Sequence, residues 1–96
     1  MHLDPAQLAA LSAILRTGGF AAAAQDLGVT QSAISQRLKT LEDRVGAQLV
    51  TRGQPCTGTE TGRRLAAHAE QVGLLEARLA RDIGALAPAP DTRLRI

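Results

Sequence analysis

The chain has 96 residues, 45% of them hydrophobic, and its 11 Lys and Arg against 9 Asp and Glu give a net charge of +2. A chain of this length folds as one small domain with an extension and has little room for a deep substrate pocket. The single cysteine excludes an internal disulfide, and neither a leader pattern nor a run of about 18 apolar residues occurs. We therefore expect a cytoplasmic protein with no membrane segment.

Three helices are predicted in the first half of the chain. The first begins at Pro5, which follows a capping aspartate, and its Leu and Ile residues recur at helical spacing up to a glycine pair. The Ala-rich stretch from Phe20 predicts a short second helix ended by Gly28, a residue that readily adopts a left-handed conformation. Thr30 is expected to cap a third helix that runs to about Val45.

The second half predicts a small β-hairpin and one long helix. Residues 47–59 contain a short β-prone run, a Gly-Gln-Pro break and a second short polar run. The helix of about 27 residues that begins near Thr59 would be roughly 40 Å long, too long for a three-helix body to cover. Its apolar stripe therefore predicts a two-fold dimer, and the residues assigned to this contact are Leu65, Val72, Leu75, Leu79, Ile83 and Leu86.

These predictions divide the chain into three parts. Residues 1–58 form the compact body, and residues 59–86 form a dimerising linker helix. Residues 87–96 contain a Pro-rich hinge followed by alternating polar and apolar residues, Arg93 to Ile96. This alternation predicts the first strand of a further domain, so we expect the chain to be part of a longer protein.

The third predicted helix has one polar face that lacks acidic residues. No Asp or Glu occurs between Gly28 and Glu42. Two helices joined by a tight glycine-containing turn, the second with such a face, are typical of the helix-turn-helix that places a helix in the major groove of DNA. A glutamine amide pairs bidentately with adenine, and a serine hydroxyl bonds to several bases. The candidate base-reading residues are Gln31, Ser32, Ser35 and Gln36.

Two cations are candidates for contacts with the DNA backbone. Lys39 lies one helical turn beyond Ser35 and Gln36, and Arg52 precedes the predicted tip of the hairpin. Both side chains are long enough to reach phosphates, and Lys39 could instead reach a guanine. A hairpin beside the recognition helix also reaches the minor groove. Each residue has a simpler interpretation: Lys39 would pair with Asp43, and Arg52 would be an ordinary exposed hairpin residue.

The sequence allows two other functional classes. In a winged-helix module that contacts proteins, the polar face would merely be solvated. In a small hydrolase, Ser35 or Cys56 would act as nucleophile, but nothing supplies a triad at known spacing or a strained nucleophile turn. His2, His68 and Cys56 show no metal-ligand spacing. We expect neither an enzyme nor a metal or cofactor site.

Residues 18–62, "GGFAAAAQDLGVTQSAISQRLKTLEDRVGAQLVTRGQPCTGTETG", combine an aromatic residue with paired alanines, a Gln-Ser-Ala-Ile-Ser helix start, Leu-Glu, a hairpin arginine and Thr-x-x-Gly. This ordered set resembles the amino-terminal region of LysR-type transcriptional regulators. The resemblance covers residues 3 to about 86. It implies a mainly α, winged helix-turn-helix fold followed by a long linker helix, with two copies bound to a pseudo-palindromic site in double-stranded DNA and higher oligomers in the full-length protein.

Carried over by position, the resemblance gives Thr30 a capping and phosphate role, turns Gln31, Ser32, Ser35 and Gln36 toward the groove and places Lys39 and Arg52 on the backbone. Two departures, Ala21 for a frequent Ser or Thr and Val50 for a frequent aromatic, affect one phosphate contact and the packing of the wing. The segment "RGQPC" with "TETG" looks most like the branch that controls lysine and arginine export. A separate carboxy-terminal domain would then bind a small-molecule effector.

Overall fold

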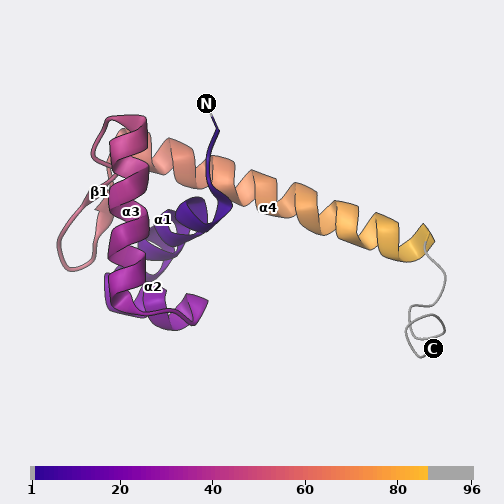
Figure 1. Cartoon of the computed structure of the whole chain (residues 1–96), viewed down its shortest axis with the longest axis horizontal. Coiled ribbons are helices and arrows are strands. Elements are labelled where there is room, and N and C mark those ends of the chain that lie inside the picture. Colours follow the sequence, from indigo (N-terminus) through magenta and orange to yellow (C-terminus); the bar gives the residue numbers. More distant parts are fainter. Residues whose placement is uncertain (1, 87–96) are drawn as a thin grey trace.

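The computed structural model describes residues 2–86. In chain order the elements are α1 (Pro5–Thr17), α2 (Phe20–Leu27), α3 (Gln31–Val45), β1 (Val50–Thr51), β2 (Thr57–Gly58) and α4 (Glu60–Leu86). Figure 1 shows α1, α2, α3 and the hairpin gathered into a head, from which α4 projects as a single long helix. This is the mainly α, winged arrangement that the sequence predicts. Within residues 2–86, no helix has the length and apolar character needed to cross a membrane.

Local signals fix where the first three helices begin and end. The Asp4 carboxylate accepts a hydrogen bond from the Ala6 backbone nitrogen at 2.7 Å and so caps α1. Thr30 caps α3 in the same way, since its hydroxyl oxygen accepts from the Ala33 nitrogen at 3.0 Å. Gly28 ends α2 with a φ of 69°, which an L side chain would adopt only with strain. The turn between α2 and α3 is therefore specified by residues of the turn itself.

The core of the head is aliphatic and lies where α1, α2 and α3 meet the hairpin and the first turns of α4. Its largest fully buried side chains are Leu11, Ile14, Ile34, Leu41 and Leu49. Burying a side chain of this size stabilises a fold by about 1.5–3 kcal/mol. No polar or charged residue among those described is buried in this core, so packing and not a polar network holds the head together.

The start of α4 is joined closely to the loop that follows α3. The Thr59 hydroxyl donates to the Gln48 carbonyl at 2.7 Å, and the Leu49 nitrogen donates to the Glu42 carboxylate at 2.8 Å. A Cβ on Gly62 would lie 1.9 Å from the Leu49 carbonyl oxygen. The Thr59 hydroxyl oxygen also accepts from the Gly62 nitrogen at 3.0 Å and so caps α4. The Thr-x-x-Gly pattern thus has a physical reason here, because threonine caps α4 and glycine lets its backbone approach the loop.

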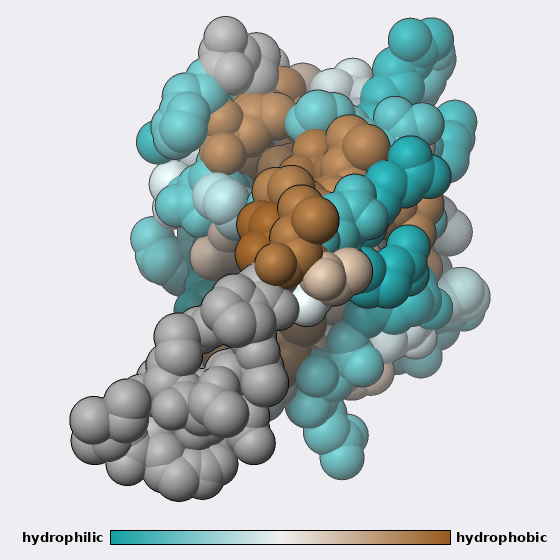
Figure 2. Space-filling view, turned by 90° about the vertical axis from the view of Figure 1, so that its right-hand side faces the viewer, coloured by the Kyte–Doolittle hydropathy of each residue, from teal (hydrophilic) through white to brown (hydrophobic). Residues whose placement is uncertain are grey.

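The predicted apolar stripe of α4 divides into two parts. Leu65 is partly buried against the core of its own chain, as is the neighbouring Ala69, so Leu65 does not belong to the exposed stripe. Farther along the helix, Leu75, Leu79, Ile83 and Leu86 are 55–86% exposed. Figure 2 shows hydrophobic residues gathered on this side of the molecule between hydrophilic ones. The sequence did not place Leu74, also exposed, in this set; the hinge and strand predicted for residues 87–96 lie outside the described residues.

Candidate nucleic-acid interface

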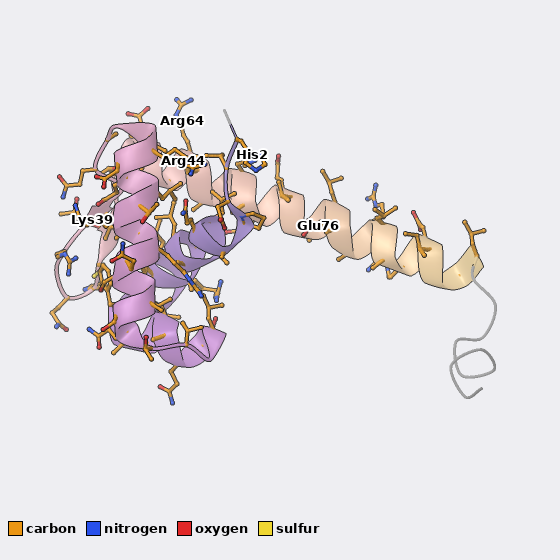
Figure 3. All side chains as sticks on the ribbon, in the orientation of Figure 1. His2, Lys39, Arg44, Arg64 and Glu76 are labelled. Carbon is orange, nitrogen blue, oxygen red and sulfur yellow. The ribbon has the colours of Figure 1, made fainter. Side chains whose placement is uncertain are left out.

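The polar face of α3 is a direct consequence of how this helix packs. Ile34, Leu38 and Leu41 are 0–3% exposed and point into the core. The helical period of 3.6 residues then turns the intervening side chains to the opposite side. One shallow surface depression is lined by five residues, all of which the sequence predicted for this face: Gln31, Ser32, Ser35, Gln36 and Lys39. Figure 3 shows Lys39 on the side of α3 that faces away from the projecting α4.

The uncharged residues of this depression are free to bind a ligand. Gln31, Ser32 and Gln36 are exposed and Ser35 is half-buried. None of these four side chains forms a hydrogen bond with another residue in the range 2–86. Amide and hydroxyl groups in such a position have donors and acceptors left for base edges. Thr30, the sixth predicted residue of the face, uses its hydroxyl oxygen as the cap but keeps its own proton to donate.

Both proposed interpretations of Lys39 are compatible with its geometry. Its ammonium lies 3.8 Å from the Asp43 carboxylate, so the predicted intrahelical pair is present. The two side chains are 73% and 69% exposed, and pairs in such surroundings contribute little because water screens them. The ammonium can therefore exchange Asp43 for a phosphate at small cost.

The wing arginine has a contact that the sequence did not indicate. The Arg52 guanidinium carbon lies 4.3 Å from the centroid of the Phe20 ring, at the first residue of α2. Arg52 is exposed and forms no ion pair with any described residue, whereas Phe20 is only 7% exposed. The composition singles out Phe20 as the one aromatic residue, but nothing local to either position predicts that they meet.

Residues 5–63 match the sequence model described as "Bacterial regulatory helix-turn-helix protein, lysR family". This match covers more than half of the chain and contains the α3 depression, Arg52 and the Thr-x-x-Gly junction. The chain belongs to the LysR family. Members of this family are transcriptional regulators and not enzymes, in agreement with the sequence prediction.

Relatives of this LysR-family chain are found among both curated proteins and solved structures. It is 52% identical over 94 residues to the HTH-type transcriptional regulator ArgP of Pseudomonas fluorescens, covering 93% of this chain and 30% of ArgP. It aligns with full-length LysG of Corynebacterium glutamicum at 42% identity and a TM-score of 0.84, over 93% of this chain and 32% of LysG. The chain thus spans about 30% of the length of these relatives.

A third relative is a domain solved with DNA. The CbnR DNA-binding domain in its DNA complex is 28% identical to this LysR-family chain, with a TM-score of 0.79 over 90% of this chain and all of that one. This likeness agrees with the winged fold that the sequence predicts.

The two departures from the family pattern have clear positions in the structure. Ala21 lies exposed in the first turn of α2, where its methyl group offers no hydroxyl to a phosphate. Val50 is 3% exposed, so this smaller residue is fully packed at the base of the wing.

The residues of the alternative hydrolase do not form a catalytic group. Cys56 is 8% exposed at the base of the wing, with its sulfur 3.7 Å from the Gly53 carbonyl oxygen, and Ser35 makes no hydrogen bond to a described residue that could act as base. In the part of the chain that the structure describes, no cluster of three His, Cys, Asp or Glu is arranged to hold a metal ion.

Proposed function

We propose that this chain is the promoter-binding part of a bacterial transcriptional regulator and that α3 enters the major groove of double-stranded DNA. The observation that carries this proposal is the α3 depression, five adjacent polar or basic side chains with no acid among them. The groove admits one α-helix, and short uncharged side chains on that helix reach base edges. The DNA complex of the related CbnR domain supports the same use of this fold.

The proposed contacts fall into two classes. Gln31, Ser32, Ser35 and Gln36 read base edges, because they are uncharged and have no partner in residues 2–86. Thr30, Lys39 and Arg52 hold the sugar-phosphate backbone. Lys39 and Arg52 contribute charge, and Thr30 contributes its hydroxyl at the amino end of α3.

Replacing one residue of each class separates the two roles. Gln36→Ala should weaken binding to the preferred site by about 1–3 kcal/mol, with little change on random DNA and an unchanged salt slope. Arg52→Ala should weaken binding to every sequence and flatten the slope of log affinity against log salt by about one unit. Titrations of selected and random duplexes at several salt concentrations measure both quantities.

Three outcomes would contradict these assignments. The first is an equal loss on both duplexes for Gln36→Ala, and the second is an unchanged slope for Arg52→Ala. The third is a wild-type chain without salt-dependent affinity for any DNA, which would favour the alternative of a winged-helix module that contacts proteins.

We also propose that two copies associate through the exposed part of α4. Leu75, Leu79, Ile83 and Leu86 form an apolar side with nothing of the described chain over it. A groove of about 440 Å³ between α1 and α4, lined in part by Leu8, Ala69 and Val72, continues the same surface toward the head. Two such surfaces related by a two-fold axis would cover each other and would match a pseudo-palindromic site.

Leu79→Glu tests this interface because it places a charge in the middle of the stripe. At micromolar concentration the wild-type chain should sediment as a dimer and the variant as a monomer. Leu74→Glu is the matched control, since Leu74 is also exposed but lies nine residues, or about 2.5 helical turns, from Ile83 and so on the other side of α4. A dimer that survives Leu79→Glu, or that Leu74→Glu disrupts equally, would contradict this interface.

The longer protein to which this chain corresponds is proposed to sense a basic amino acid. Full-length LysG has been solved with bound effector Arg and is 38% identical to this chain, which agrees with the lysine and arginine export branch predicted from "RGQPC". We propose a cytoplasmic protein whose residues 87–96 lead into an effector-binding domain, with higher oligomers formed at full length. Footprints of the full-length regulator with and without arginine would test this, and an unchanged footprint and an absence of arginine binding would contradict it.

A further inference from the structure

The wing is attached to the turn between α1 and α2 by three contacts. The Cys56 nitrogen donates a hydrogen bond to the Gly18 carbonyl at 2.8 Å. Gly18 approaches Pro55 so closely that an added Cβ would lie 2.9 Å from the proline Cβ. The third is a cation–π contact, in which the Arg52 guanidinium carbon lies over the ring of Phe20. The first two place the backbone of the wing, and the third places the guanidinium itself.

The contact with Phe20 leaves the N–H donors of the Arg52 guanidinium without a hydrogen-bond partner among residues 2–86. A cation–π contact does not require a specific N–H hydrogen bond, and a guanidinium carries five N–H donors. Four other arginines behave differently and direct N–H groups at polar partners in the chain: Arg16 at Asp26, Arg44 at the His2 carbonyl, Arg63 at the Gly58 carbonyl and Arg64 at Glu60. Arg52 forms no hydrogen bond with any residue in 2–86, so its donors are available to an incoming anion.

Burial alone does not require an aromatic residue at position 20. The rest of the core consists of Leu, Ile, Val, Ala and Cys, and a leucine at this position would still fill much of the same space. Only an aromatic ring offers a negatively polarised face to a cation. Phe20 is the one Phe, Tyr or Trp of the chain, and the Arg52 guanidinium lies over its ring.

We propose that Phe20 is a positioning residue that holds the Arg52 guanidinium ready for a DNA phosphate. A long arginine side chain loses rotamer freedom when it binds, and the contact with Phe20 removes part of this loss beforehand. Phe20 is mostly buried and acts on DNA affinity through Arg52 alone. This inference rests on the proposed DNA-binding function and deepens it by giving the wing contact a fixed geometry.

A double-mutant cycle on DNA affinity tests the coupling in the 96-residue chain. Phe20→Leu should weaken binding to specific and random duplexes alike by about 2- to 5-fold, the range that an exposed cation–π contact provides. In an Arg52→Ala background the same Phe20→Leu change should have no further effect. Ile14→Val, a comparable trimming of the core on α1, should change affinity in neither background once folding is verified by circular dichroism.

Proton chemical shifts of Arg52 test the geometry without DNA. Because Phe20 is the only Phe, Tyr or Trp residue, its ring current should shift the Arg52 side-chain protons upfield in the free chain, and Phe20→Leu should abolish that shift. Absence of the shift, or a Phe20→Leu loss of equal size in both Arg52 backgrounds, would overturn the positioning role while leaving DNA binding intact. A wild-type chain that has the shift but binds no DNA would overturn the proposed function, and with it the role of this contact.

Discussion

The head and the projecting part of α4 use the same residue types in opposite ways. Leu11 and Leu41 in the head are fully buried, whereas Leu79 and Leu86 on α4 are 57% and 86% exposed. The leucines of both regions recur at helical spacing. The hydrophobic pattern of a helix therefore does not show which other element, if any, covers its apolar side. The difference teaches that the head covers its own apolar residues, while those on the far part of α4 have no cover among the described residues.

The transition between these regions occurs within a single helix. Gly62 and Ala66 are buried against the head, and Leu65 and Ala69 are partly buried. From Gly73 to Leu86 every residue is exposed. Substitutions on the two sides of this transition lie in the same helix. A difference between their effects on stability therefore reports the difference in burial.

Leucine truncation should give the largest contrast. Leu41→Ala removes a fully buried side chain and should lower the free energy of unfolding by about 2–5 kcal/mol at any protein concentration. Leu79→Ala should change it by less than about 0.5 kcal/mol at concentrations where the chain is monomeric, with a loss that grows as concentration rises. Urea unfolding over a range of protein concentrations measures both. If Leu79→Ala lowered the free energy of unfolding equally at all concentrations, Leu79 would be covered by its own chain.

The effect of replacing glycine by alanine on stability should change sign along α4. Gly62→Ala brings a Cβ against the Leu49 carbonyl and should destabilise the head by about 1–3 kcal/mol. Gly73→Ala meets nothing within 4 Å and should stabilise the helix by up to about 1 kcal/mol. Thermal unfolding of the two variants checks the opposite signs. Destabilisation by Gly73→Ala would show that a partner chain approaches that position closely.

The cap of the recognition helix should have an intermediate effect. Thr30→Ala removes the acceptor of the Ala33 nitrogen and should lower stability by about 1 kcal/mol, while Thr30→Ser, which keeps that acceptor, should lose much less. Chemical denaturation gives the stabilities. Equal losses in the two variants would indicate that the methyl group, and not the cap, is what Thr30 contributes.

Removal of the surface pair on α3 should have the smallest effect on stability. Asp43→Ala frees Lys39 from an exposed pair and should alter the free energy of unfolding by less than about 0.5 kcal/mol. The same change should leave DNA affinity equal or higher, because the ammonium no longer has a competing carboxylate. A clear loss of DNA affinity would assign Asp43 a role of its own.

The candidate site was largely predictable because its main part lies on one helix. Gln31, Ser32, Ser35, Gln36 and Lys39 are spaced so that they share a face whenever the segment is helical, and the structure brings all five together. The wing contributes Arg52, whose position beside the hairpin tip was also predicted, although its contact with Phe20 was not. The partner contacts of α4 and the DNA contacts themselves stay predictions.

The sequence by itself determined the features that depend on neighbouring residues. Asp4 and Thr30 begin helices and Gly28 ends one, because caps and left-handed turns involve residues only a few positions apart.

Only the tertiary structure decided that Leu65 is partly covered and Leu79 is not, or that Phe20 meets Arg52. Leu65 and Leu79 occupy equivalent positions of one repeat, so the place where the head stops covering α4 depends on how α1 packs against it. Phe20 and Arg52 are far apart in sequence and meet because Cys56 joins the wing to the turn at Gly18. Such contacts follow from the relative placement of whole elements, which no local pattern encodes.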